Sequence, residues 1–461
     1  MKLRTLLKNH FIGDDLVIDS ITVHSKEIEY SYLESLVDIK SINRYVLTVL
    51  DQYSIKQLKH IEQYLPDCHI QSIKEEMIDE YLGNGFLILN CYSLLAIEFR
   101  SNLSRGVPTI SSELSLSGPK DSFSEVFQIN LGLIRRRIKS SNLCCDSFVL
   151  GRYTKTKVSI LSIKGIVKTD LVQHVKENLL KIDIDGVIDS SYLRYSLENK
   201  FHLFPTIMMS ERPDKCSMAL LEGKVVVLVD NSPYALILPS FFFDYFHTAD
   251  DYYQKSFNAS FIRMIRFMAF IIALYVPGGY LSVTTRDYSL IPLNLLLVLK
   301  AGRSFVPFPA YLEALFMIVC FEILKESDLR MSTTSGSAIS ILGGLILGDA
   351  AVAAGIVSPI MIIIIAISSI SGLIFTSVEL GNALRTYKIL FLILATLFGI
   401  YGIIFGTFIL LYDLCSTEIF GYSYLSFNFH DIKDSIIKID SVIPKRNSKL
   451  SNNIIRGRYH K

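Results

Sequence analysis

The sequence is short of charge and of paired cysteines. Charged residues make up 20% of its 461 positions, and the formal net charge is +2. Because 50% of the residues are hydrophobic, the composition excludes a disordered chain. The small net charge excludes a nucleic-acid binder that works by bulk positive charge. The seven cysteines form no C-x-x-C pair, so we expect reduced thiols, no disulfide framework, no zinc site and no cofactor.

The common catalytic signatures are also missing. The sequence has no P-loop, no G-x-S-x-G, no H-E-x-x-H and no EF-hand loop. Its nine histidines lack the spacing of metal ligands. We therefore expect a protein that is not an enzyme. The N-terminus mixes charges and lacks a continuous apolar run, so we expect no cleavable signal peptide and a cytoplasmic N-terminal region.

Charge disappears from long stretches of the C-terminal half. No charged residue occurs between Asp349 and Glu379, or between Lys388 and Asp413. Each gap exceeds the ~20 residues that a helix needs to cross a bilayer. We expect four to six membrane segments, with candidates at 261–276 (ending at Pro277), 290–299, 311–324, 337–357, 359–378 and 389–412. The 290–299 candidate is short and interrupted by Pro292, which suits a re-entrant segment.

These patterns divide the chain into four parts. The expected architecture is an α/β cytosolic N-terminal region of two subdomains, followed by an α-helical polytopic membrane domain. The expected boundaries are 1–140 and 141–258 for the subdomains, 259–426 for the membrane domain and 427–461 for a basic C-terminal tail.

The side of the membrane on which the tail lies stays open. Lys255, Arg263 and Arg266 flank the first span and place its N-terminal side in the cytoplasm. A cytoplasmic tail would need an even number of crossings. Arg385 and Lys388 also favour a cytoplasmic position for the short loop before the last span. Six simple spans cannot place both that loop and the tail in the cytoplasm.

The N-terminal half carries mixed α/β patterns. Apolar runs at 86–90, 94–98, 158–163 and 225–229 predict strands. An S-x-x-E pattern at 122–125 predicts a capping box. It precedes a helix with a predicted apolar face of Val126, Ile129, Leu133, Ile134 and Ile138. A second helix is expected from Thr169, with Leu171, Val175 and Leu179 on one face. No internal repeat stands out.

Two charged motifs are candidate subunit contacts. The first is a basic cluster that could contact phosphate or lipid headgroups, be a solvated helix face or pair with acidic neighbours: Arg135, Arg136, Arg137 and Lys139. The second is a compact charged turn, held by internal ion pairs or available to another subunit: Glu211, Arg212 and Asp214.

Small residues gather in the 337–357 segment. They let helices approach closely in lipid, either within one subunit or around a shared axis, and they include Gly343, Gly344, Gly348 and Ala353. Gly344 and Gly348 form one G-x-x-x-G pair, and Gly402 and Gly406 form a second. Asp349 lies either inside a bundle, facing a partner or water, or at the membrane surface. Glu313 and Glu322 pose the same question, and Arg303 could neutralise one of them.

Several longer motifs follow one another along the chain. They are SGPKDSFSEVFQINLGLIRRRI (117–138), FPTIMMSERPD (204–214), LLEGKVVVLVDNSPYALILPSFF (220–242) and DDYY (250–253), then VPGGY (276–280), RSFVPFPAYLEALFMIVCFEILKES (303–327), ILGGLILGDAAVAAGIVSPIMI (341–362) and LFGIYGI (397–403). In this order the motifs resemble the A subunit of GerA-type spore germinant receptors, from about residue 80 to about residue 426.

The resemblance implies two cytosolic α/β subdomains and a membrane region in the inner membrane of the bacterial endospore. It implies a transporter-like B subunit that senses the nutrient and a lipoprotein C subunit as partners. It also implies assembly of A subunits, as a pentamer, into a cation channel. The sequence departs from the family at Gly279 and Ser332, and at 284–288 and 422–426, where expected aromatic, proline or acidic residues are replaced.

Three functions are consistent with these features. The first is a channel lined by the small-residue segment, with Asp349 attracting cations at the pore mouth. The second is a permease that moves a small solute, which the interrupted segments around Pro292 and Gly348 would suit. The third is a membrane scaffold without a pore.

Overall fold

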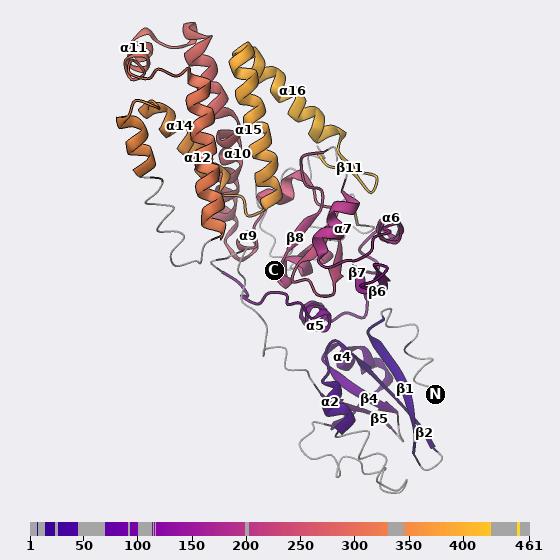
Figure 1. Ribbon diagram of the computed structural model, residues 1–461. Coiled ribbons are helices and arrows are strands. Elements are labelled where there is room, and N and C mark those ends of the chain that lie inside the picture. Colours follow the sequence, from indigo (N-terminus) through magenta and orange to yellow (C-terminus); the bar gives the residue numbers. More distant parts are fainter. Residues whose placement is uncertain are drawn as a thin grey trace.

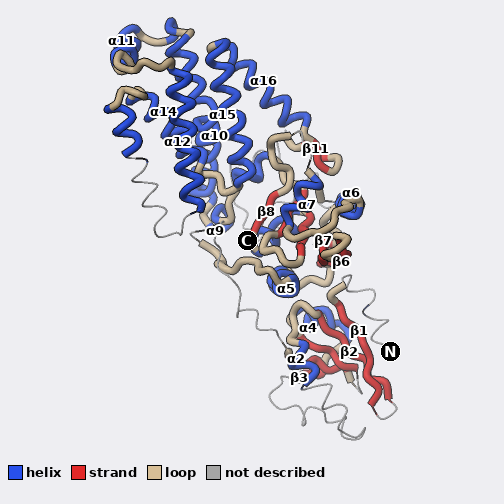
Figure 2. The backbone as a smooth tube through the Cα atoms, viewed as in Figure 1, coloured by secondary structure: helices blue, strands red, loops and turns tan. Residues whose placement is uncertain are grey.

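The computed structural model shows two β-sheet units followed by a bundle of helices (Figures 1 and 2). The structure describes residues 7, 14–23, 26–44, 70–90, 93–99, 113, 115, 117–198, 202–330, 344, 346–425 and 450–451. The first sheet lies at one end of the molecule, the second sheet in the middle, and the helices at the other end.

The first unit is an antiparallel sheet in the order β1-β2-β4-β5-β3. Its strands are β1 (Leu16–Val23), β2 (Lys26–Leu33), β3 (Ile70–Ser72), β4 (Phe86–Asn90) and β5 (Leu94–Glu98). Its helices are α2 (Ile39–Ile42), η3 (Glu75–Met77) and α4 (Ile78–Gly83). The helix α5 (Phe127–Arg137) lies between this sheet and the next (Figure 1).

The second unit is an antiparallel sheet in the order β6-β7-β9-β10-β8. Its strands are β6 (Leu143–Leu150), β7 (Thr156–Ile163), β8 (Met208–Ser210), β9 (Val225–Val229) and β10 (Ala235–Leu238). Its helices are α6 (Thr169–Leu180), α7 (Ser190–Leu197) and α8 (Pro213–Glu222), with η4 (Phe242–Phe246) and α9 (Asp250–Tyr253) after the last strand.

The two units repeat one topology. In each, a hairpin of two long strands is followed by a helix, an edge strand, another helix and a second hairpin. The strands then pair in the same order, with the third strand at the far edge beside the fifth. Residues 31–40 and 161–170 follow the same succession of strand, turn and helix. The repeat is one of strand pairing, which the sequence does not display, so the expectation of no internal repeat was wrong at the level of the fold.

Several predictions for this half are confirmed. The runs 86–90, 94–98 and 225–229 are strands with those bounds, and 158–163 lies within β7. Leu171, Val175 and Leu179 form the buried face of α6. The domain boundaries themselves stay predictions.

The predicted capping box at 122–125 was wrong. The helix α5 begins at Phe127 after Val126, and no side chain caps its first turn. The side chain of Asn130 instead binds the backbone of Ser124: the backbone N–H of Ser124 donates to Asn130 Oδ1, and Asn130 Nδ2 donates to the carbonyl O of Ser124. Val126 is exposed rather than part of the apolar face.

The helical part contains α10 (Ser256–Thr285), η5 (Tyr288–Leu290), α11 (Leu293–Ala301), α12 (Ala310–Arg330), α14 (Pro359–Gly372), α15 (Val378–Phe398) and α16 (Ile400–Ser416). A short hairpin follows, β11 (Glu418–Ile419) and β12 (Tyr422–Ser423). Two of the described helices, α10 and α15, are long and apolar enough to cross a membrane, and α14 and α16 are shorter apolar helices.

The expected end of the first span at Pro277 was wrong. The helix α10 is 30 residues long and continues through Pro277 to Thr285. A proline removes one helical hydrogen bond, which helix packing can compensate. Gly278 supplies that packing, because a Cβ on it would lie 3.3 Å from the carbonyl O of Phe391 in α15.

The expected single span at 389–412 was also wrong. Gly399 separates α15 from α16 with φ 62° and ψ −138°, a conformation open almost only to glycine. The 359–378 span is likewise shorter than expected, because α14 ends at Gly372.

This helical hairpin changes the expected position of one basic pair. Arg385 and Lys388 lie inside α15 and belong to no preceding loop. The turn at Gly399 lies beside Asp287 at the far end of α10. The helix α16 then runs back to the second sheet, where Asp413 meets His202. The described end of α16 therefore lies on the side of the second sheet.

Candidate functional site

The small-residue helix has one open face, although its Ala351 is buried against neighbouring helices. Residues 346–353 are helical, as is Gly344, while Gly343 lies outside the described residues. Among the described residues, and apart from the backbone of the same helix, no heavy atom lies within 4 Å of a Cβ built on Gly348, and one on Gly344 meets only Leu324 Cδ1 at 3.8 Å. Asp349 and Ala353 are exposed. No described residue therefore covers this face, and its pore-lining role stays a prediction.

The second G-x-x-x-G pair packs within the chain. A Cβ on Gly402 would collide with the carbonyl O of Leu394, and one on Gly406 would lie 3.1 Å from Leu394 Cδ1. Both glycines of this pair thus serve the close approach of α16 to α15. The same sequence signature has two different surroundings in this fold.

A buried ion pair ties a loop to the starts of two helices. Arg303 Nη2 donates to Glu313 Oε1 at 2.8 Å, and the backbone N–H of Ser358 donates to Glu313 Oε2 at 3.0 Å. Glu313 is 1% exposed. The carboxylate thus joins the start of α12, the loop before it and the start of α14, where helix N–H groups favour negative charge. The expectation that Arg303 neutralises one of the two glutamates is confirmed.

A second buried cluster fixes α10 to the second sheet unit. Asp251 in α9 accepts from Arg263 Nε at 3.0 Å and from Arg266 Nη1 at 2.8 Å. Arg266 also donates to the carbonyl O of Phe246 and the hydroxyl of Thr248. Arg263 and Arg266 therefore lie within α10, are buried and pair with Asp251 of α9. Of the three cations used to orient the first span, only Lys255 is exposed.

The basic cluster has three different surroundings. Arg135 is buried and makes two hydrogen bonds of 2.6 Å with Asp15, which precedes β1. Arg137 pairs with Asp121 at 2.6 Å. Arg136 is exposed. Two of the three arginines thus fasten parts of the same chain, and a subunit contact stays a prediction that Arg136 is best placed to make.

The charged turn is an internal network. Arg212, which is 1% exposed, donates to both carboxylate oxygens of Asp214 at 3.0 and 2.7 Å. It also donates to the Glu113 carbonyl and the Ser115 hydroxyl, while Glu211 accepts from the backbone N–H of Glu113. The turn therefore holds the segment that connects the two sheet units.

The neighbouring guanidinium of Arg212 decides the ionisation of Asp214. Burial alone would raise the pKa of Asp214, but the hydrogen bonds and charge of Arg212 outweigh burial and lower that pKa below its ordinary value. The hydroxyl of Tyr253 adds a hydrogen bond of 2.8 Å to the same carboxylate. The internal pairing explains why Glu211, Arg212 and Asp214 lie together, and their role as a subunit interface stays a prediction.

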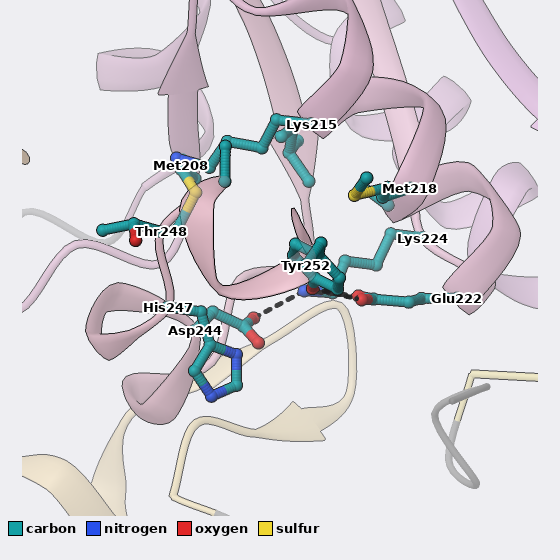
Figure 3. Close-up of a pocket in the computed structure, with 12 residues that line it drawn as sticks. Met208, Lys215, Met218, Glu222, Lys224, Asp244, His247, Thr248 and Tyr252 are labelled. Atoms are coloured by element: carbon teal, nitrogen blue, oxygen red, sulfur yellow. Dashed lines mark hydrogen bonds and ion pairs between the residues drawn. The ribbon is translucent and has the colours of Figure 1, made fainter. Parts of the chain in front are cut away.

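A small cavity lies beside α8 and α9 (Figure 3). Its polar part is formed by Lys224, whose ammonium lies 2.7 Å from Asp244 and 3.4 Å from Glu222. Burial raises the pKa of Glu222, and the two carboxylates raise the pKa of Lys224 against its burial. The cavity measures about 40 Å³. A small organic ligand needs roughly 300 Å³ or more, so this cavity does not fit one.

The chain matches one protein family over almost its whole length. The model of the "Bacillus/Clostridium GerA spore germination protein" family matches residues 2–449. This chain belongs to the GerA family of spore germination proteins. Family membership supports a role in spore germination receptors.

Individual relatives cover most of the chain. Spore germination protein KA of Bacillus subtilis (strain 168) is 34% identical over 93% of this chain and 82% of its own length. Spore germination protein GerQA of Bacillus cereus is 34% identical over 92% of this chain and 87% of its own length. An uncharacterized membrane protein of Bacillus subtilis (strain 168), YfkQ, is 32% identical over 88% of this chain and 82% of its own length.

One solved structure is also similar. It is the N-terminal domain of the A subunit of the Bacillus megaterium spore germinant receptor GerK3, at 25% sequence identity and a TM-score of 0.38. The match covers 52% of this GerA-family chain and 92% of that domain.

Replacing Asp251 by alanine should strongly destabilise this GerA-family protein. The change leaves the guanidinium groups of Arg263 and Arg266 buried without their carboxylate, which typically costs about 3–5 kcal/mol of unfolding free energy. Asp183→Ala is the matched control, because the Arg152–Asp183 pair is solvent-exposed and its loss should leave stability unchanged. Denaturant unfolding in mild detergent measures both variants. Equal stability of the two variants would contradict the role given to Asp251.

Proposed function

We propose that the chain is the A subunit of a nutrient germinant receptor in the inner membrane of the bacterial endospore. It would act with a transporter-like B subunit and a lipoprotein C subunit, with its sheet units in the cytosol and without enzymatic activity. Family membership supports this role, and the GerK3 protein bears the name of a germinant receptor A subunit. The apolar helices support the membrane location.

The path of the helices supports an even number of membrane passages. The helices α10, α15 and the 346–353 segment run away from the second sheet, while α12, α14 and α16 run toward it (Figure 1). At the sheet end, α10 begins beside α9 and α16 ends beside His202. At the far end, Gly355 meets the carbonyl O of Phe305. Both ends of the helical region would then face the cytosol.

The open small-residue face carries the channel proposal. No described atom outside its own helix lies near the place of a side chain on Gly348, and contact with a second copy would explain this open space beside a glycine of an apolar helix. Several copies arranged around this face, as a pentamer, would bring their exposed Asp349 carboxylates near a common axis. Carboxylates at a pore mouth attract cations.

The helix α7 and the loop between α7 and β8 offer a path by which the sheet unit can act on the helices. Arg194 in α7 pairs with Glu379 in the first turn of α15. His202 contacts Asp413 of α16 at 2.8 Å, and Tyr387 of α15 donates to the same carboxylate at 2.6 Å. The α15–α16 hairpin is thus held at both of its sheet-side ends. A partner that moves this loop would bias a closed-to-open equilibrium, provided that the nutrient binds the two states differently.

The purified full-length protein in liposomes should release a trapped monovalent cation. Asp349→Asn should reduce the preference for cations over anions by several-fold, because it removes the charge at the proposed pore mouth. If the variant conducts as the wild type does, the role of Asp349 is wrong. Absence of flux from the wild type would favour a scaffold, and saturable, solute-specific uptake would favour a permease.

Gly348→Leu should dissociate the proposed oligomer without unfolding the chain. Its side chain would enter open space within one copy and collide with the neighbouring copy at the shared face. Gly406→Leu is the contrasting variant, because it collides with Leu394 and Phe391 of its own chain and should lower stability. Native mass spectrometry in mild detergent measures the oligomer. A monomeric wild type, or an unchanged oligomer in Gly348→Leu, would contradict the proposal that copies meet at this face.

Arg194→Gln and Glu379→Gln should each weaken the response of spores to nutrient. We expect the ratio of nutrient-stimulated to basal cation release to fall about tenfold, from a charged hydrogen bond that contributes ~1.5 kcal/mol. The double variant should be no worse than either single one, because both remove the same contact. Arg152→Gln, at an exposed pair, is the control. Additive losses at equal receptor abundance would show that the two residues act separately.

A further inference from the structure

The repeated topology reveals one position that the two sheet units fill differently. After β2, the backbone N–H of Asp38 donates to the carbonyl O of Phe99 at 3.0 Å. Phe99 directly follows β5, so the first unit completes this contact with its own last strand. The equivalent donor in the second unit is the backbone N–H of Lys168, which follows β7 at the same place in the repeat.

In the second unit the contact comes from the far end of the chain. The N–H of Lys168 donates to the carbonyl O of Leu450 at 3.0 Å, and Val167 pairs with Ser451 in an antiparallel bridge. The chain cannot supply a residue directly after β10, because there it turns aside: the N–H of Ser240 donates to Thr206, and the path continues to η4 and the helices.

The side chain of Leu450 is part of the core of the second unit. It is 0% exposed and belongs to the apolar cluster that includes Val167, Leu171 and Ile419. Phe99 occupies the corresponding place in the cluster of the first unit, at 7% exposure. Gly223, whose φ of 97° ends α8, lies beside the segment: a Cβ built on it would be in ordinary van der Waals contact with the backbone carbon of Leu450, at 3.5 Å.

We infer that the second sheet unit contains a docking groove for an extended peptide segment with one apolar side chain, and that the C-terminal segment around Leu450 is its occupant. Val167, Lys168 and Gly223 form the backbone part of the groove. Main-chain hydrogen bonds provide affinity, and the buried leucine side chain provides specificity, as in strand addition to a sheet edge.

The docked segment acts as a clip. The β11–β12 hairpin lies beside it, with Ile419 in the same apolar cluster and Tyr422 under the ammonium of Lys168. The end of α16 is thus tied to the second unit at the hairpin and again at Leu450. The clip also requires the C-terminal segment to lie on the same side of any membrane as the two sheets.

A disulfide between Val167→Cys and Ser451→Cys tests the docking in the full-length protein. Paired antiparallel residues have Cα atoms about 4.5–5.5 Å apart, within the ~4.4–6.8 Å that a disulfide spans. Mild oxidation of native membranes should form this bond, and mass spectrometry of the joined peptides detects it. Val149→Cys with Ser451→Cys is the control, because Val149 is exposed on β6 and distant in register from Val167. No bond in the first pair, or equal yield in both, overturns the inference.

Leu450→Asp tests the apolar side chain without relying on cysteine. A carboxylate in this cluster should release the segment, so limited proteolysis should cut the C-terminal tail about tenfold faster or more, while the sheet core resists as before. Leu450→Met should behave as the wild type. A synthetic peptide of residues 446–455 should bind the Leu450→Asp protein, and one with Asp in place of its leucine should not. Equal cleavage of wild type and Leu450→Asp, or equal binding of both peptides, would show that the groove is absent.

Discussion

Buried carboxylate–guanidinium pairs hold the parts of this molecule to one another. Asp15–Arg135 joins the first sheet to α5, Arg212–Asp214 holds the segment between the sheets, and Asp251–Arg266 joins the second sheet to α10. Such a pair adds little stability compared with an apolar contact, but losing one partner strands a buried charge. The pairs therefore fix which surfaces meet and in what register. The apolar clusters around them supply most of the stabilising burial.

The fold was predictable where local pattern decides it. Strands β4, β5 and β9 are continuous apolar runs, and Leu171, Val175 and Leu179 mark α6 by their spacing. Charged contacts were predictable only when both partners lie near each other, as Arg303 and Glu313 do. The partners of Arg135 and Arg194 lie 120 and 185 residues away in sequence, and spacing carries no signal for such a pair. The single span expected at 389–412 failed for a related reason, because hydropathy is blind to a break at one glycine.

The two G-x-x-x-G pairs show how far a motif can be interpreted. Gly402 and Gly406 are explained by α15, so their function ends within the chain. Gly344 and Gly348 have the same spacing, but among the described residues a Cβ on either meets at most Leu324 Cδ1, so α12, α14 and the other described helices do not explain them as α15 explains the second pair. The structure thus distinguishes two G-x-x-x-G pairs that look alike in the sequence. It also shows that Asp349, beside Gly348, faces outward rather than into the bundle of its own chain.

The helical region is best understood as an excursion from the second sheet unit. It leaves at α10, where Asp251 binds two arginines, and it returns at α16, the β11–β12 hairpin and Leu450. These attachments differ in kind. The start is fixed by a buried cluster within one helix turn, whereas the α15–α16 hairpin is held by Arg194 of α7 and by His202 on the loop that follows α7. A displacement of α7 and that loop would therefore move α15 and α16 while α10 stays in place, and the close contact between Gly278 of α10 and Phe391 of α15 is one point at which the movement must be absorbed.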